Sequence, residues 1–331
     1  MLKPSSCSQG RCMDFSFERL QLDEIDSDNT FYRITTTEDK PPIIESVSRI
    51  GLICPVVIKI VRGRYWVVSG FRRIQSCRQL GQQTIPCLLL PDSCDEVSCA
   101  ELAITENLTQ RSLNVVEQAR CLQILTTVTG HLKDATIIAN AVGLSLNHDL
   151  ATKLKTILAS PEMIRVGIIK GKLSLNVALA MSELPPKDAL ALAKLFHRFP
   201  MGQNKQREIL QNLREIAARD NTTLRGILEE EPLKGILDDG EMDGNQKSRA
   251  LRSYCRKRRF PRIVQTENAF QGNVKKLRLG DAIQLSPPPG FEGSFCTMSI
   301  RIGSLNGLID AHRKITEALK NPALEDLFNS L

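Results

Sequence analysis

The pattern of hydrophobic and polar positions divides the chain into a first part with strands, a helical middle and a final part where a strand returns. In the first part, alternating or β-branched runs predict strands at 15–25, 55–61, 65–69 and 84–90. The glycine turn Arg62-Gly63-Arg64 joins two of these runs, which predicts a hairpin. Helices are expected at 42–49, 71–80 and 95–105. We therefore expect a small mixed α/β domain at 15–114, after a flexible tail at 1–14.

The middle part carries helical patterns alone, from Asn114 onward. Helices are expected at 115–129, 135–141, 146–159, 174–181, 186–199 and 206–219, with one more starting at Pro161 and ending before Gly171. The turn at Val142-Gly143, followed by Ser145 as an N-cap, gives the outline of a helix-turn-helix. This pattern predicts an all-α DNA-binding domain at 115–228. Its candidate DNA contacts are Ser145, Asn147, His148, Lys153, Lys155, Lys172 and Ser174.

Charge changes sign abruptly after residue 228, because acidic residues dominate up to Asp243 and basic residues dominate from Lys247 to Arg262. This composition predicts a charged linker at 229–259, whose basic run either grips phosphates or is simply solvated. The remaining 260–331 carries a strand pattern at 295–302 and an amphipathic helix at 305–319. Elements this small cannot bury their apolar sides alone, so we expect a C-terminal dimerisation region of α+β type. The alternative is packing on the helical domain.

Composition narrows the function classes for the 331 residues, of which 42% are hydrophobic and 24% charged, as in a globular protein. The net charge of +7 is weak support for a nucleic-acid partner, and the aromatic content of 5%, with Trp66 as the one tryptophan, disfavours a base-stacking platform. Ten cysteines without any CxxC spacing disfavour zinc and disulfide frameworks. Since no signal peptide or membrane-spanning run occurs, the expected location is the cytoplasm, associated with the nucleoid, and no membrane partner is expected.

Two short segments carry the candidate chemistry. Ser69-Gly70-Phe71-Arg72-Arg73 places paired arginines at the start of a helix, where guanidinium groups and backbone N–H groups can hold an anion. Glu106-Asn107, expected on a short loop before Arg111, offers oxygen ligands for a divalent cation bridging to that anion. The alternatives are solvated charge for the arginines and helix capping for Glu106-Asn107. Neither GxGxxG nor GxxxxGK[ST] occurs, so a dinucleotide fold and a P-loop are not supported.

The order of these motifs resembles the ParB family of chromosome and plasmid partition proteins, over about 15–228. The segment 50–57 is similar to the family's entry to its hairpin, and Gly70-Phe71-Arg72-Arg73 looks like its G-E-R-R box. Glu106-Asn107-Leu108 with the following 113–119 looks like its E-N-L-Q-R segment, and Gly171-Lys172-Leu173-Ser174 looks like its G-K-L-S segment. The first domain would then have the fold that ParB shares with sulfiredoxin.

This resemblance implies a CTP-dependent DNA clamp that uses Mg²⁺, forms a homodimer, binds inverted-repeat double-stranded DNA and works with a partition ATPase. Carried onto this chain, it implies a nucleotide site of nine residues: Arg33, Gly70, Phe71, Arg72, Arg73, Glu106, Asn107, Gln110 and Arg111. Glu106 and Asn107 would hold the metal, and Glu106 would be the candidate catalytic residue of a weak CTPase that releases CDP and phosphate.

Three features depart from the family's pattern. Phe71 stands where the family has Glu, Arg111 comes one residue later than the family's arginine, and the stretch 143–161 is about two residues longer. One alternative function is a transcriptional or nucleoid regulator on the same scaffold without a partition role. A second is a sulfiredoxin-like redox enzyme. Sulfiredoxin has a catalytic cysteine in the loop that here reads Gly70-Phe71-Arg72-Arg73, so Cys77 in the following helix would have to act as the reactive thiol.

Overall fold

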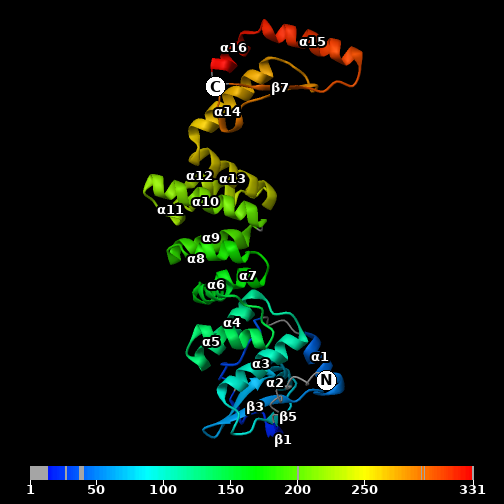
Figure 1. Cartoon of the computed structure of the whole chain (residues 1–331), viewed down its shortest axis with the longest axis vertical. Helices are drawn as coiled ribbons and strands as arrows, with labels where there is room; N and C mark the ends of the chain where they lie inside the picture. The colour runs from blue at the N-terminus through cyan, green and yellow to red at the C-terminus, as the bar shows by residue number, and fades with distance from the viewer. Residues whose placement is uncertain are drawn as a thin grey trace, which may run out of the picture. The chain divides into compact units, whose positions relative to one another are not determined.

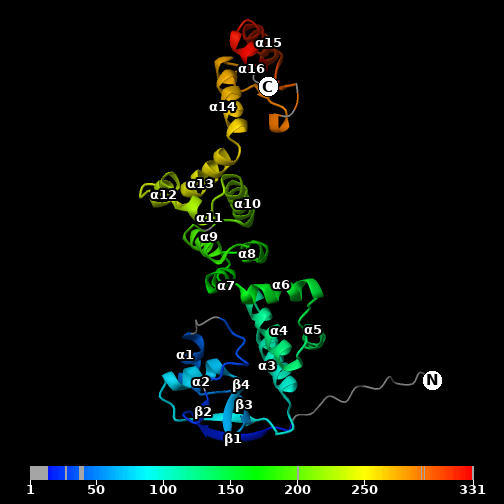
Figure 2. The same cartoon turned by 90° about the vertical axis from the view of Figure 1, so that its left-hand side faces the viewer.

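The structure is a computed structural model that describes residues 14–26, 28–36, 41–199, 201–291, 293 and 295–329. The expected tail at 1–14 lies outside the described residues except for Asp14. Two compact units divide the chain, Met1–Arg198 and Phe199–Leu331. Figures 1 and 2 show the elements of both.

The first unit contains a sheet followed by helices. Its elements are β1 (Ser16–Gln21), β2 (Ile25–Asp26), α1 (Pro41–Ile50), β3 (Val56–Val61), β4 (Arg64–Ser69), α2 (Phe71–Gln79), β5 (Thr84–Leu89), α3 (Glu96–Gln110), α4 (Val115–Thr129), α5 (Leu132–Ala141), α6 (His148–Ala159), α7 (Glu162–Ile169), α8 (Leu175–Ser182) and α9 (Pro186–Arg198).

The sheet has the strand order β1-β5-β3-β4-β2, with both parallel and antiparallel pairs. β3 and β4 form the predicted hairpin, and Arg62 and Gly63 both have positive φ (52° and 76°), as a tight hairpin turn requires. β1 runs antiparallel to β5 at the edge of the sheet, which confirms a strand within the predicted range 15–25. The mixed α/β prediction for this region is therefore confirmed.

The two faces of the sheet carry two apolar clusters. Val56 and Ile58 pack in a cluster with residues of α1 and α2, whereas Val57, between them, packs in a cluster with residues of α3 and α4. This alternation follows from the period of two in a β-strand. Figure 2 shows α1 and α2 beside the sheet, and it shows α3 and α4 between the sheet and α6.

The expected loop at Glu106-Asn107 is wrong, because α3 continues through both residues to Gln110. The interval 96–110 contains neither glycine nor proline, so nothing in the sequence stops the helix there. The side-chain amide of Asn107 donates to the carbonyl of Ala103 at 2.8 Å, so this residue is bonded to the previous turn of its own helix.

The helix-turn-helix outline is confirmed in α5 and α6, but its predicted cap is wrong. The side chain of Asn140 binds both the N–H and the C=O of Leu146, so that residue cannot begin a helix. The helix begins two residues later at His148, where Asn147 accepts a hydrogen bond from the N–H of Leu150 at 2.7 Å. Asn147 is therefore the cap, and Ser145 lies exposed in the turn. Farther along, Ser174 caps α8 as predicted.

The second unit contains a helical part followed by a small α+β part. Its elements are α10 (Gln203–Asp220), α11 (Leu224–Leu228), α12 (Glu231–Asp238), α13 (Gly244–Arg259), α14 (Pro261–Lys276), β6 (Ile283–Ser286), η1 (Pro289–Phe291), β7 (Thr297–Ile300), α15 (Leu305–Leu319) and α16 (Pro322–Asn329).

The interval 229–259 is not a linker, since α12 and α13 occupy most of it and bury Leu233 and Leu251. Asp243 forms a capping box with Gln246 at the start of α13. The charges that suggested a solvated segment pair with each other and with α10, as in Arg252–Glu208 at 2.6 Å and Arg258–Asp220 at 2.9 Å. The helices at 229–259 could not be predicted from composition, because the charges along one segment do not show which other helix they pair with.

The last part of the second unit is α+β, as predicted. β6 and β7 form an antiparallel pair, and Phe270, Leu277 and Leu285 are buried in a cluster to which α15 contributes Ala311. Leu305 and Leu319 on the same helix remain 72% and 68% exposed. The expected self-association stays a prediction.

Candidate anion-binding site

Three segments far apart in the sequence meet in one cleft of the first unit. The loop before α1, the start of α2 and the last turn of α3 line it together. All nine residues that the sequence singled out lie on this lining: Arg33, Gly70, Phe71, Arg72, Arg73, Glu106, Asn107, Gln110 and Arg111. The sheet and α3 thus bring the predicted residues together, while their role in binding stays a prediction.

Gly70 shapes the floor of the cleft. It adopts a left-handed conformation (φ 102°) immediately before α2, where a Cβ atom would stand 2.7 Å from Cγ1 of Val56. Glycine is the residue that accepts this conformation and this close approach without strain. Because no side chain caps α2, its first N–H groups remain available to an anion.

The paired arginines have different surroundings. Arg73 donates to the carbonyl groups of Cys54 (3.1 Å) and Pro55 (2.6 Å) and also pairs with Glu106, so it ties α2 to the start of β3 and to α3. Arg72 has a buried Nε atom that meets no acceptor among the described residues. Burial, followed by the nearby charge of Arg111, lowers the pKa of Arg72. An anion in the cleft would relieve both effects.

Glu106 and Asn107 fit a divalent cation. Oε1 of Glu106 accepts hydrogen bonds from Arg73 and Gln110, whereas its Oε2 is buried without a partner among the described residues. From the described residues, Oδ1 of Asn107 accepts one long hydrogen bond of 3.4 Å, from the hydroxyl of Thr35. Within the described ranges no group of three His, Cys, Asp or Glu residues could hold a metal ion. A cation here would therefore need phosphate oxygens as well, which is the usual coordination of Mg²⁺ beside a nucleotide.

Arg111 lines the cleft but binds a residue that the sequence reasoning missed. Its guanidinium forms two hydrogen bonds with the carboxylate of Glu117, at 2.6 and 2.9 Å. The side chain of Glu117 is fully buried, and hydrogen bonds from Arg111 and the N–H groups of Thr36 and Asn114 outweigh burial and lower its pKa. The capping-box spacing of Asn114 and Glu117 was the available signal. This pair fixes the corner between α3 and α4.

Phe71 has a structural reason to be apolar. Its ring packs against both apolar clusters, on either face of the sheet, at the point where α2 begins. A glutamate side chain at this position would bring a carboxylate against these apolar side chains. The substitution thus removes a polar group from the cleft and adds contact area between the clusters.

Cys77 does not fit a reactive thiol. It is fully buried in the cluster beneath α2, and burial raises its pKa. A reactive cysteine needs exposure and an electropositive environment that stabilises the thiolate. The structure therefore gives no support to a sulfiredoxin-like reaction at this residue.

The candidate DNA contacts lie on or near α6, with different degrees of availability. The helix buries Ala151, Leu154 and Ile157, and turns His148 and Lys155 outward with Thr152 and Thr156. Lys153 pairs with Asp149 at 2.5 Å, which reduces its attraction for phosphates. Away from α6, Lys172 donates to the carbonyl of His197 at 3.0 Å, and Ser174 is occupied as a cap. Lys155 is thus the basic side chain of α6 that no described carboxylate pairs with.

Comparison with known proteins relates the segment that contains most of this cleft to a protein family. Residues 14–108, which include seven of the nine candidate residues, match the family model described as ParB N-terminal domain. The chain is 27% identical over 160 residues to the chromosome-partitioning protein ParB of Caulobacter vibrioides, which covers 47% of this chain and 50% of that protein. It is also 27% identical over 158 residues to a nucleoid occlusion protein of Halalkalibacterium halodurans, covering 47% and 54%. The chain thus spans about half the length of the curated relatives it matches.

Among solved structures, a C-terminally truncated ParB from Caulobacter crescentus complexed with CTP-gamma-S aligns over 55% of this chain and 99% of that chain. The identity is 22% and the TM-score is 0.26, a score that does not by itself indicate a common fold. The domain match and the curated relatives confirm the resemblance to the ParB family that the motif order indicated. No helix in the described part of the chain is long and apolar enough to cross a membrane.

Proposed function

We propose that this chain, a member of the ParB family through its domain at 14–108, binds CTP with Mg²⁺ in the cleft and double-stranded DNA through α5 and α6. The observation that carries the proposal is the convergence of the nine predicted residues on one cleft from three separate segments. A triphosphate needs guanidinium groups, helix N–H groups and a cation together, and the cleft offers the first two and oxygen ligands for the third.

Each residue of the cleft has a proposed role. Arg72 and the first N–H groups of α2 hold the phosphates, with Gly70 allowing their approach. Glu106 Oε2 and Asn107 Oδ1 hold the cation, which neutralises phosphate charge when bound. Arg73 positions Glu106, and Arg111 positions α4 through Glu117. Arg33, Phe71 and Gln110 complete the lining.

The proposed biological role is partition of a chromosome or plasmid, by a homodimer that binds an inverted repeat and works with a partition ATPase in the nucleoid. Its support is the family match and the similarity to the chromosome-partitioning ParB of Caulobacter vibrioides. The similar match to a nucleoid occlusion protein favours the second candidate, a nucleoid or transcriptional regulator on the same scaffold. Binding of a purified partition ATPase from the same genome would separate the two.

Hydrolysis of CTP to CDP and phosphate is proposed only as a weak activity. Glu106, its candidate catalytic residue, has one oxygen engaged by Arg73, and Phe71 contributes no polar group near it. We therefore expect binding to be strong and turnover slow.

The binding half of this proposal is tested by Arg72→Gln in the full-length chain. Loss of a charge-assisted hydrogen bond to phosphate should weaken CTP binding by about 10- to 100-fold in calorimetry. Arg64→Gln is the matched control, because Arg64 is exposed on the hairpin and lies outside the cleft. Equal CTP affinity in wild type and Arg72→Gln would contradict the assignment of the cleft.

A further inference from the structure

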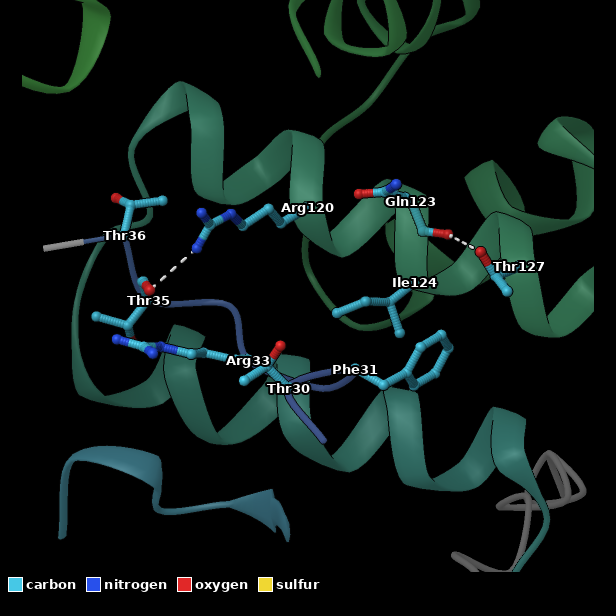
Figure 3. Close-up of a pocket in the computed structure, with 9 residues that line it drawn as sticks. All are labelled: Thr30, Phe31, Arg33, Thr35, Thr36, Arg120, Gln123, Ile124 and Thr127. Atoms are coloured by element: carbon cyan, nitrogen blue, oxygen red, sulfur yellow. Dashed lines mark hydrogen bonds between the residues drawn. The ribbon is translucent and has the colours of Figure 1, made fainter. Parts of the chain in front are cut away.

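A second, larger cavity lies beside the cleft, between the loop at 30–36 and α4. Its volume is about 500 Å³, which falls in the range of small-molecule sites. Figure 3 shows the side chains that line it, contributed by the loop on one side and by one face of α4 on the other. Arg33 and Thr35 line both this cavity and the cleft, whereas Arg120 lines this cavity alone.

The described lining of the cavity has an excess of positive charge. Among the residues that the structure describes, it contains two arginines, Arg33 and Arg120, and no acidic residue. No carboxylate in the described ranges forms a salt bridge with either one, and Glu117, whose charge acts on Arg120, is already held by Arg111. Burial and then the charges of Arg33 and Arg165 lower the pKa of Arg120, against a smaller opposing effect of Glu117. Two guanidinium groups held close together favour an anion between them.

Arg120 is held in place by the loop that carries Arg33. It donates hydrogen bonds to the carbonyl groups of Thr35 at 3.1 Å and Ile34 at 3.5 Å. Figure 3 shows Arg33 and Arg120 on the same side of the cavity as the hydroxyl-bearing side chains of Thr35 and Thr36. The Thr35 hydroxyl already donates to Asn107 and the Thr36 hydroxyl to Glu117, so the guanidinium groups are the donors offered to phosphate oxygens.

The other end of the cavity is apolar. Phe31 and Ile124 lie there, away from the arginines, with Gln123 and Thr127 above them in Figure 3. The ring of Phe31 packs edge-on against Tyr32, with centroids 4.8 Å apart, so its position is fixed. A ligand that fits this lining carries an anion at one end and a ring or other apolar group at the other.

We propose that this cavity binds a phosphate-bearing small molecule with a ring, with the phosphate between Arg33 and Arg120 and the ring against Phe31 and Ile124. The ligand neutralises the repulsion between the two arginines. Because that loop also presents Arg33 to the cleft, occupancy of the cavity adjusts the position of a residue of the neighbouring site. The inference does not depend on nucleotide binding in the cleft.

Calorimetry on the full-length chain tests this, with inorganic phosphate and phenyl phosphate as probes at constant ionic strength. Phenyl phosphate should bind more tightly than phosphate, because its ring buries apolar surface on Phe31 and Ile124. Arg120→Gln should weaken both by at least about tenfold, and Arg120→Lys should retain most of the affinity. Arg64→Gln, on the exposed hairpin and outside both the cleft and this cavity, should bind both probes as wild type does.

The opposite pattern overturns the inference. Loss of phosphate binding in Arg72→Gln, with wild-type binding in Arg120→Gln, would place the anion in the cleft. If Arg120→Gln does not fold, as judged by circular dichroism, Phe31→Leu decides. Loss of the preference for phenyl phosphate in that variant supports the cavity, and an unchanged preference contradicts it.

Discussion

At the scale of single residues, the arginines of the cleft differ in function although they are adjacent in sequence. Arg73 is bonded to two carbonyl groups and to Glu106, so removing it would disturb the fold of the cleft as well as its charge. Arg72 lacks such bonds at its buried Nε, so its charge is available to a ligand. The sequence showed two arginines at a helix start but could not show which one the protein itself uses.

Gly70→Ala tests the close approach at the floor of the cleft. The added Cβ would meet Cγ1 of Val56 at 2.7 Å in a left-handed conformation, so unfolding free energy should fall by about 1–3 kcal/mol. Gly51→Ala is the control, since Gly51 has a similar φ (74°) with no atom within 4 Å of an added Cβ. Urea unfolding of both variants measures the difference. If both variants lose the same free energy of unfolding, the contact of the added Cβ with Val56 does not destabilise the fold.

The buried pair of Arg111 and Glu117 predicts a response to acid. The pKa of Glu117 is lower in the folded protein than in the unfolded chain, where it is about 4.3. The ionised carboxylate therefore stabilises the fold above about pH 4.3, and this stabilisation is lost as pH falls through the folded pKa. Glu117→Gln should cost about 3–5 kcal/mol at neutral pH, because it leaves the partner charge unpaired. Its stability should also decline less than that of wild type below about pH 5.

Thermal or urea unfolding between pH 7 and pH 3 measures both effects. The exposed Glu24 provides the control variant, Glu24→Gln, which should follow the wild-type curve. A Glu117→Gln curve parallel to wild type below pH 5 would show that this carboxyl does not titrate with folding.

At the scale of elements, regular patterns were predictable and interactions between distant elements were not. The β-branched runs that became β3 and β4, the glycine turn between them, and the helix at Leu305–Leu319 were all readable from local sequence. The end of α3 was missed, since polar residues such as Asn107 look like loop residues while remaining compatible with a helix. The linker at 229–259 was wrong for a different reason. Arg252 and Arg258 bind carboxylates of α10 that lie 44 and 38 residues away in the sequence.

Some residues of the candidate site could be predicted from the sequence and others could not. Its nine residues were predictable because a resemblance in motif order pointed to them, and the fold then brought them to one cleft. Glu117 lies in the 113–119 motif and was not singled out as a site residue, and Arg120 lies outside the motifs; both act through contacts with the loop at 30–36.

Helix α6 predicts a specific difference between two lysines. Lys155 is exposed without a described carboxylate partner, while Lys153 pairs with Asp149. DNA affinity should fall as salt rises, and Lys155→Gln should reduce the slope of log affinity against log salt by about one. Lys153→Gln should change it less. Fluorescence anisotropy with an inverted-repeat DNA measures the slopes, and a flat salt response of the wild type would contradict phosphate contact altogether.

At the scale of the whole molecule, the exposed apolar face of α15 predicts self-association. Leu308 and Ile309 are 44% and 59% exposed on a helix whose other side packs against the buried Phe270 cluster. Deleting 260–331 should convert a dimer into a monomer in light scattering, and Leu308→Asp with Ile309→Asp should do the same while keeping the chain intact. A monomeric full-length chain would contradict this prediction.

We propose that the cleft of this chain binds cytidine triphosphate in preference to other nucleotides. Calorimetry of the full-length protein with CTP, ATP, GTP and UTP in the presence of Mg²⁺ tests it most directly. We predict measurable binding of CTP, at least about tenfold weaker binding of the other three, and loss of CTP binding in Arg72→Gln. Equal affinity for all four nucleotides, or no binding of any, would contradict the account.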